Sequence, residues 1–514
     1  MRDREPITAR RAPTGVEGLD NILGGGLPAN RLYLLQGGPG VGKTTLALQF
    51  LLTGQKHDEQ GIYVSLSESR DELAAIAHSH GWVLDGMAVH EISVRGKLPG
   101  DDDSTDDPRY TVFHPSEIEL EGVTRNIMAE TKRLKPARVV IDSLSELRLL
   151  AGDPLRYRRQ ILMLKEFFAS WPCTVLLLDP KSEAGPDFET LAYGVLSLDQ
   201  FVPPYGRKRR RLRLAKLRGV NVDDGFHDFK IRTGGIAVFP RLVAADHRRH
   251  TEQEVVPSGV SNLDSLLGGG LTRGSSTLVM GAAGTGKSTF CTQYALSAAQ
   301  RGERVAVFSF DESREMWLSR ARSMKVPIQE FVDSGQVTIQ TIDPGELAPN
   351  EFVETVRRTV DDQGAQVVVI DSLNGYLNAT PDERYLVAQL HELLAYLSDR
   401  VVLTLLVVAQ QGLIGTGIES PVEISYLADS VILLRYFEHA GVVRQAISCL
   451  KKRYGVHERT IRELRLGEGG IQVGETLNHF HGVLSGMPEY HGPQEPLLDA
   501  ARPPPRPDKR GGAE

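Results

Sequence analysis

The sequence predicts an α/β chain that carries two copies of one domain, each with a mostly parallel sheet flanked by helices. Three observations predict this class: a long segment occurs twice, short β-branched apolar runs alternate with helical patterns, and each copy has a glycine-rich phosphate-loop signature between such a run and a helix. Runs that are apolar on both faces suit strands buried between two layers of helices.

The duplication is clearest near the start of each copy. PTGVEGLDNILGGGLPANRLYLLQGGPGVGKTT spans residues 13–45 and PSGVSNLDSLLGGGLTRGSSTLVMGAAGTGKST spans 257–289, with 16 of 33 positions identical at an offset of 244. The offset still relates Glu68 to Glu312 but falls to 229 between Asp142 and Asp371, so the first copy has 15 extra residues in between. The acidic run KLPGDDDSTDDPRY (97–110) is the expected insertion, either a solvated loop or a docking loop for a partner.

Composition changes mark the expected domain boundaries. The polar stretch DHRRHTEQE separates the copies, and the residues after about 485 are rich in Pro and Gly. We expect a first domain at 1–246, a second at 247–485, and a disordered Pro-rich tail at 486–514.

Each copy contains four short apolar runs that predict buried strands. In the first copy they are RLYLLQG (31–37), GIYVSLS (61–67), ARVVIDS (137–143) and CTVLLLD (173–179). In the second they are SSTLVMG (275–281), RVAVFSF (304–310), QVVVIDS (366–372) and TLLVVAQ (404–410).

Two segments match the phosphate-loop signature, GGPGVGKT (37–44) and GAAGTGKS (281–288). Glycines let backbone N–H groups surround a phosphate, the lysine reaches the β- and γ-phosphates, and the Ser or Thr hydroxyl binds Mg²⁺. A chance glycine-rich turn is the alternative, but two matches in register argue against it. The predicted phosphate-binding residues are Gly37, Gly40, Gly42, Lys43, Thr44, Thr45, Gly281, Gly284, Gly286, Lys287, Ser288 and Thr289.

Two apolar strands end in an aspartate, Asp142 in RVVIDS and Asp371 in VVVIDS. A carboxylate at this position is the Walker B arrangement, which holds Mg²⁺ directly or through water. With Thr44 and Ser288 they form the predicted metal ligands; a purely structural aspartate is the alternative.

Hydrolysis needs a group that orients or deprotonates the attacking water. The stretches VSLSES and VFSFDES supply Glu68 in the first copy and Asp311 with Glu312 in the second. We expect their strands to lie next to the phosphate-loop strands. The alternative is an ordinary helix cap at Ser69 and Ser313.

Later in each copy two cations lie two residues apart, Lys216 with Arg218 and Lys451 with Arg453. On a strand this spacing puts both on one face, and such cations often act on the nucleotide of a neighbouring subunit. A solvated basic edge strand is the alternative. The run RKRRR (207–211) predicts a hairpin tip with solvated arginines rather than a nucleic-acid site.

The bulk composition excludes several classes. A net charge of −7, from 59 basic and 66 acidic residues, gives no drive toward nucleic acid or anionic membranes. Three separated cysteines predict buried thiols in a reducing compartment. Without an apolar signal region or a run of roughly 20 apolar residues, we expect a cytoplasmic protein with no membrane span.

The double phosphate loop, the TGV and LGGGLP lead-in, the acidic strand end, IDS and KLRG together resemble the KaiC family, RecA-like ATPases named for the cyanobacterial circadian clock. The resemblance covers about residues 12–485. It implies two tandem RecA-like P-loop domains, a homo-hexameric ring, and ATP with Mg²⁺ between adjacent subunits. It also implies a mainly ATPase N-terminal tier, a C-terminal tier with Ser/Thr autokinase activity, and KaiB-like or other signalling partners.

The family's paired glutamates fall on Ser67 and Glu68 in the first copy, so one carboxylate is missing there. Its phosphorylated Ser–Thr pair falls on Ser425 and Tyr426, which leaves Ser425 as the candidate phosphoacceptor.

The leading interpretation is an ATP-hydrolysing signalling ATPase with autokinase activity as a further option. The alternatives are a RecA- or DnaB-like DNA-dependent ATPase and a nucleotide-gated scaffold with slow hydrolysis. From the carboxylate count we predict that the first site binds ATP and hydrolyses slowly, while the second does more of the chemistry.

Overall fold

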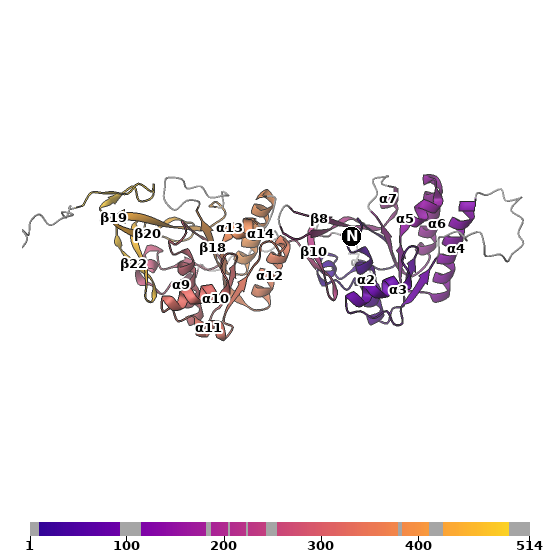
Figure 1. Cartoon of the computed structure of the whole chain (residues 1–514), viewed down its shortest axis with the longest axis horizontal. Helices are drawn as coiled ribbons and strands as arrows, with labels where there is room; N and C mark the ends of the chain where they lie inside the picture. Colours follow the sequence, from indigo (N-terminus) through magenta and orange to yellow (C-terminus); the bar gives the residue numbers. More distant parts are fainter. Residues whose placement is uncertain are drawn as a thin grey trace, which may run out of the picture. The chain divides into compact units, whose positions relative to one another are not determined.

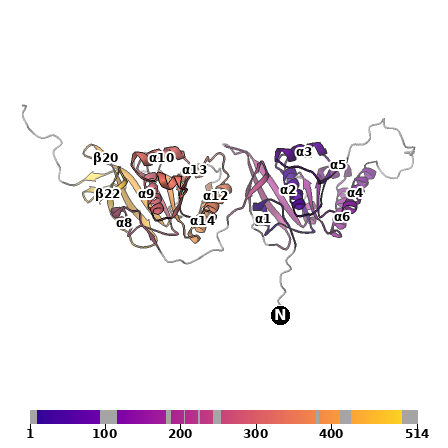
Figure 2. The ribbon, with the colours of Figure 1, turned by 90° about the horizontal axis from the view of Figure 1, so that it is seen from below.

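The computed structural model describes residues 10–92, 115–180, 187–203, 206–220, 222, 225–242, 254–378, 383–410 and 425–492. The chain divides into two compact units, Met1–Val243 with Gly345–Thr355, and Ala244–Pro344 with Val356–Glu514. Each unit is built on a nine-stranded sheet with helices on both faces (Figures 1 and 2), so the predicted fold class is confirmed. The acidic segment 97–110, most of the expected linker and the tail beyond residue 492 lie outside the described residues.

The first sheet has six parallel strands followed by three antiparallel ones. The parallel strands, in spatial order, are β5 (Ala88–Glu91), β4 (Gly61–Ser65), β6 (Arg138–Asp142), β7 (Thr174–Asp179), β3 (Leu32–Gly37) and β8 (Gly194–Phe201). The antiparallel strands are β9 (Arg209–Leu217), β10 (His227–Arg232) and β11 (Gly235–Phe239), and a separate pair joins β1 (Arg11–Ala12) to β2 (Leu27–Pro28). The helices are α1 (Glu17–Ile22), α2 (Lys43–Lys56), α3 (Arg70–Ser79), α4 (Pro115–Leu134), α5 (Leu144–Ala151), α6 (Pro154–Ala169) and α7 (Asp187–Leu191).

The second sheet repeats this order. Its parallel strands are β16 (Val337–Thr341), β15 (Arg304–Ser309), β17 (Ala365–Asp371), β18 (Leu403–Ala409), β14 (Ser276–Gly281) and β19 (Ser430–His439). The antiparallel strands are β20 (Val442–Lys452), β21 (Ile461–Gly467) and β22 (Gly470–Thr476), with two further pairs, β12 (Val255–Val256) with β13 (Leu271–Thr272) and β23 (Phe480–His481) with β24 (Glu489–Tyr490). The helices are α8 (Ser261–Leu266), α9 (Lys287–Gln300), α10 (Arg314–Ser323), α11 (Gln329–Asp333), α12 (Pro349–Asp361), α13 (Leu373–Asn378) and α14 (Glu383–Asp399).

Alternate residues of the central strands enter two separate cores. In the first unit, Tyr33 and Leu35 pack with α2 on one face of the sheet, while Leu32 and Leu34 pack with α4 and α6 on the other. A strand that is buried on both faces must be apolar throughout, which is why these runs show no alternation in the sequence.

The order of the strands corrects one expectation. We expected the strands that carry the candidate acids, β4 and β15, to lie beside the phosphate-loop strands β3 and β14. Two strands separate them in each sheet, β6 with β7 and β17 with β18. The chain leaving β4 compensates, because the Leu66 N–H donates to the Asp142 carbonyl oxygen (2.7 Å) and so carries the following acid over the end of β6. Phe310 does the same with Asp371, also at 2.7 Å.

The basic run also differs from its prediction. Arg209–Arg211 belong to β9 instead of a hairpin tip, and the Arg209 side chain is buried. Arg211 lies 3.5 Å from a carboxylate oxygen of Asp228 and stacks on the ring of Phe201. These arginines contribute to the antiparallel part of the sheet.

The three cysteines are buried free thiols, as predicted. Among the described residues, no helix is long and apolar enough to span a bilayer.

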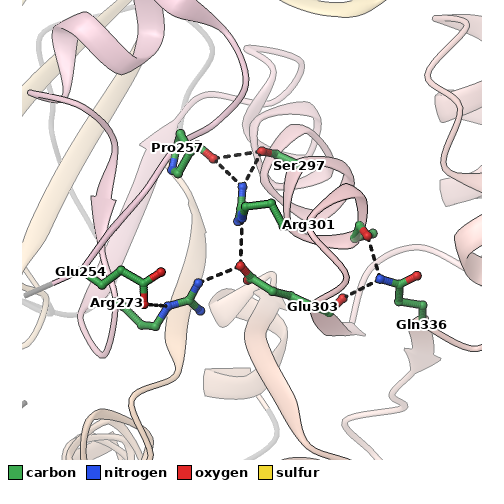
Figure 3. A network of polar contacts seen from close by, with 8 residues as sticks. Glu254, Pro257, Arg273, Ser297, Arg301, Glu303 and Gln336 are labelled. Atoms are coloured by element: carbon green, nitrogen blue, oxygen red, sulfur yellow. Dashed lines mark hydrogen bonds and ion pairs between the residues drawn. The ribbon is translucent and has the colours of Figure 1, made fainter.

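In each copy an arginine bonds the proline that begins the repeated segment, but the two arginines do not occupy equivalent positions of the repeat. Fully buried Arg138 donates to the Pro13 carbonyl oxygen (2.6 Å) and pairs with Glu59 (2.7 Å). In the second copy Arg301 donates to the Pro257 carbonyl oxygen (3.1 Å) and pairs with Glu303 (2.8 Å), as Figure 3 shows. Glu59 and Glu303 are related by the offset of 244, so the duplication kept the glutamate and exchanged its cation.

Candidate functional site

Both phosphate loops have the conformation that their glycines permit. Gly42 and Gly286 precede α2 and α9 with φ of 113° and 101°, in the left-handed region that other residues rarely adopt. Gly37 and Gly281 are required by packing instead, because a Cβ there would lie 2.6 Å and 2.5 Å from the carbonyl oxygens of Leu198 and Leu434. Each loop therefore needs its glycines for two reasons, backbone shape and close approach to the next strand.

At Gly40 (φ 67°) an added Cβ would meet no atom within 4 Å, so this part of the first loop borders open space. At Gly284 (φ 78°) the Cβ would meet the Tyr436 hydroxyl at 2.6 Å. Tyr436 donates to the Ala283 carbonyl oxygen (3.2 Å), and Gln200 holds the first loop in the same way through Pro39 (3.0 Å). Sequence reasoning missed these two loop supports, because they lie far along the chain on β19 and β8.

The two lysines are partly buried cations whose close partners are backbone carbonyls. Lys43 donates to the carbonyl oxygens of Gly37 (2.6 Å) and Gly38 (3.1 Å), and Lys287 to that of Ala282 (2.7 Å). Burial lowers the pKa of both ammonium groups. A phosphate placed in the loop would supply the anion that these cations lack as a direct partner, so the lysines fit a nucleotide.

The predicted metal ligands come together in each copy. The Asp142 carboxylate accepts from the Tyr63 hydroxyl at 2.5 Å and from the Thr44 hydroxyl at 3.4 Å, and Ser288 hydrogen-bonds Asp371. Burial raises the pKa of both aspartates. No group of three or more His, Cys, Asp or Glu side chains suited to a metal occurs in the described part of the chain. One hydroxyl and one carboxylate match a Mg²⁺ that is shared with nucleotide phosphates.

The side chains of Thr45 and Thr289 face away from the loops. The Thr45 hydroxyl lies 3.4 Å from His80 Nε2, and the Thr289 hydroxyl lies 4.0 Å from the sulfur of Met324. Any contact of these two residues with phosphate would therefore use their backbone N–H groups at the helix N-termini.

Glu68 has the surroundings of a general base. One of its carboxylate oxygens, Oε2, is buried without a hydrogen-bond partner. Burial, together with the charges of Asp142 and Glu72, raises the pKa of Glu68 to about 7, and the charge of Lys43 opposes this shift. A pKa near the working pH is the value that suits a proton acceptor. The capping alternative also holds, because Ser69 forms a capping box with Glu72 at the start of α3.

The corresponding acids of the second copy, Asp311 and Glu312, both accept hydrogen bonds from side chains. Asp311 accepts from the Ser372 hydroxyl, and both oxygens of Glu312 accept from Nη1 of Arg320 on α10. The offset of 244 puts Ile76 at the place of Arg320 in the first copy. Counting carboxylates predicted faster chemistry in the second domain, but those carboxylates are hydrogen-bonded in the structure, whereas Oε2 of Glu68 has no partner.

One further carboxylate was missed from the sequence. Asp179 ends β7, the strand next to the phosphate-loop strand, and it accepts from Arg148 at 2.8 Å. Its other oxygen is buried without a hydrogen-bond partner, and its charge acts on Lys43. The strand end LLLD was the available signal, since the second copy has Val408 at this register position.

The candidate trans-acting cations lie away from the phosphate loop of their own domain. In the sheet, Lys216 on β9 is paired with Val195 on β8. Val195 precedes by three residues Leu198, which is paired with Gly37 of the phosphate loop. Three residues correspond to about 10 Å along a strand. In the second sheet Lys451 is opposite Val431, three residues before Leu434, the neighbour of Gly281.

In each copy the candidate cations have partners within their own domain. Lys216 and Arg218 both donate to the Thr190 carbonyl oxygen, at 3.2 Å and 2.9 Å. Lys451 donates to the carbonyl oxygens of Ser425 (3.1 Å) and Ala428 (2.8 Å), while Arg453 pairs with Asp429 (2.9 Å).

A β-bulge precedes the lysine in both copies, at Ala215 and at Leu450. Bulges re-aim the side chains that follow them. The candidate phosphoacceptor Ser425 is exposed in a turn before β19.

Comparisons with known proteins agree with the duplicated architecture. A model of the ATPase family KaiC matches the chain twice, at residues 12–243 and 256–478. The chain is 28% identical over 497 residues to the circadian clock oscillator protein KaiC of Parasynechococcus marenigrum, covering 94% of both chains. It is 28% identical to the protein of that name from Prochlorococcus marinus (94% of this chain, 96% of the relative). It is 26% identical to the circadian clock protein KaiC3 of Synechocystis (96% and 98%).

Proposed function

The chain belongs to the KaiC family of ATPases, and from this membership we propose that both domains bind ATP with Mg²⁺ and that the first domain performs most of the hydrolysis. The observation that carries the second half of this proposal is the contrast between Glu68 and Glu312. Glu68 has a buried oxygen without a partner, whereas Glu312 is held at both oxygens by Arg320.

The roles of the loop residues follow from their positions. The loop N–H groups and the ammonium of Lys43 would bind the β- and γ-phosphates, and the Thr44 hydroxyl with Asp142 would hold the metal ion. Bound Mg²⁺ would neutralise charge that develops on the phosphate oxygens. Tyr63 would fix the Asp142 carboxylate through its 2.5 Å hydrogen bond. Lys287, Ser288 and Asp371 would take the corresponding positions in the second domain.

Glu68 would accept the proton of the attacking water. The carboxylate must be ionised to do so, and its raised pKa of about 7 makes it a stronger base than an exposed glutamate. Asp179 would help to balance the charge of Lys43.

We further propose that Lys216 with Arg218, and Lys451 with Arg453, act on ATP held by an adjacent copy of the chain in a ring. Their place about 10 Å along the strand from the level of their own phosphate loop supports action in trans. The expected subunit number of six comes from the family. If sedimentation with ATP and Mg²⁺ gave only monomer, the trans role would fail.

We also propose that Ser425 of the second domain accepts a phosphoryl group from ATP. This serine is exposed, and its carbonyl oxygen accepts from Lys451, one of the proposed trans cations. The site that Ser425 faces would then belong to the neighbouring subunit. Mass spectrometry after incubation with ATP should find phosphate on Ser425; equal labelling in a Ser425→Ala variant would remove it as the acceptor.

The main experiment measures ATP turnover of the full chain and of Glu68→Gln. We expect the variant to lose most of the activity while keeping its affinity for a fluorescent ATP analogue. Many-fold stimulation by DNA would favour a DNA-dependent motor instead. Strong binding with negligible turnover of the wild type would favour the nucleotide-gated scaffold. Partners of the KaiB-like kind remain part of the proposal, to be sought by co-purification.

A further inference from the structure

The contact between Arg320 and Glu312 differs in kind from an ordinary surface ion pair. The Nη1 atom of Arg320 donates to both carboxylate oxygens of Glu312, and the two side chains are 25% and 31% exposed. A charged acceptor bonded to a charged donor is stronger and more specific than a neutral pair. The contact therefore fixes the orientation of the glutamate.

The guanidinium of Arg320 lies close enough to the second phosphate site for its charge to act there. Its charge acts on Asp371, the predicted metal ligand, and on the buried thiol of Cys291 in α9. Its second terminal nitrogen, Nη2, is buried and has no hydrogen-bond partner. A buried donor without an acceptor is costly, which indicates that packing within the site holds the arginine there.

The first copy provides a natural comparison. Glu68 occupies the position of Glu312, the backbone turn is the same, and Ser65 bonds the Glu68 backbone as Ser309 bonds that of Glu312. Ile76 replaces Arg320 on the following helix. The two sites share a backbone frame and differ in whether a cation engages the candidate base.

We propose that Arg320 is a positioning residue that restrains Glu312 and so makes the second domain the slow, ATP-retaining site. To orient and deprotonate a water, Glu312 needs a free oxygen directed at it. Arg320 bonds both oxygens, which restrains the orientation of the carboxylate, and its positive charge opposes proton uptake by Glu312, so the glutamate is a weaker base than one without this partner. This inference rests on the proposed function, because it assumes that Glu312 is the base of the second site.

A reciprocal exchange tests the restraint. The starting variant is the full chain with Glu68→Gln, which leaves hydrolysis to the second site. Adding Arg320→Ile, the residue of the first copy, should raise turnover about tenfold or more, and adding Glu312→Gln should remove the gain. In the separate wild-type background, Ile76→Arg should lower turnover by a similar factor, since it provides the first site with the same cation.

Affinity and a second variant separate this role from the alternatives. Arg320→Met keeps most of the aliphatic stem and should release Glu312 as Arg320→Ile does, while the affinity for a fluorescent ATP analogue stays unchanged. Unchanged or lower turnover in both Arg320 variants would overturn the proposal. A loss of ATP affinity would also overturn it, because Arg320 would then be a phosphate ligand. Full turnover in Glu68→Gln alone would instead refute the proposed function of the first domain.

Discussion

The pH dependence of the first site follows from the surroundings of Glu68. Burial raises the pKa of this carboxyl to about 7, and the group must be ionised to accept a proton. A single group with that pKa is about 9% ionised at pH 6 and about 91% at pH 8. The value of kcat/KM, which reports groups of the free enzyme, should therefore rise about tenfold between these pH values and then level off.

The assay is ATP turnover at saturating Mg²⁺ in the Lys287→Ala background, which disables the second phosphate loop. Glu68→Gln is the matched control, because the amide keeps the shape and cannot ionise. It should lower kcat/KM at pH 8 by about 10² or more and flatten the profile. A profile of Glu68→Gln that still rises tenfold would refute the assignment of the base.

The same pKa makes a prediction about stability. A folded-state pKa above the unfolded value means that the stability contributed by the neutral carboxyl is complete below pH 4.5 and is lost as pH rises through about 7. Glu68→Gln should therefore unfold at a higher temperature than the wild type at pH 8 and show little difference at pH 5. Lower activity with higher thermal stability would be the joint signature of a buried base.

Three further predictions concern other residues of the sites. Tyr63→Phe should raise the Mg²⁺ concentration for half-maximal turnover about tenfold, since losing a hydrogen bond that orients a metal ligand typically costs about 10- to 100-fold in metal affinity. Tyr33→Phe removes an equally buried hydroxyl bonded to a backbone carbonyl at 2.6 Å and should leave this Mg²⁺ concentration unchanged; equal effects of the two changes would count against a metal role. Asp179→Asn should destabilise the first unit, and a double-mutant cycle with Arg148→Met, followed by urea unfolding, should give a coupling of about 1 kcal/mol or more; additive effects would mean the pair contributes nothing. Lys216→Ala and Glu68→Gln chains should each be nearly inactive at the first site, yet a mixture assembled with ATP should recover activity at interfaces that combine intact residues; a mixture no more active than its components would exclude action in trans.

The sequence predicted local features well because they depend on local physics. The eight apolar runs became strands β3, β4, β6, β7, β14, β15, β17 and β18, each within about two residues of its expected bounds. The phosphate loops, with a strand before and a helix after, also lie where the glycine spacing placed them.

Features that depend on long-range pairing were not predicted. The positions of β6 and β7 between β4 and β3 result from helical crossovers, which leave no trace in the strand sequences. In the three antiparallel strands that extend each sheet, polar and apolar residues alternate too weakly to predict which strands pair. Arg209–Arg211 were therefore expected in a solvated turn.

The candidate site shows the same division. Spacing identified Glu68 and Glu312, but it could not show which of them has a free oxygen. That difference is set by Arg320 on the next helix and by Ile76 at the same place in the first copy. A count of carboxylates therefore favours one domain and the contacts of those carboxylates favour the other, because the neighbours of an acid decide its chemistry more than its number.

Two single variants of the full chain test directly which domain turns over ATP. Steady-state ATP turnover at pH 8 should fall by tenfold or more in Glu68→Gln and by less than about twofold in Glu312→Gln. Loss of most turnover in Glu312→Gln, with Glu68→Gln near wild type, would show instead that the second domain turns over ATP and the first retains it.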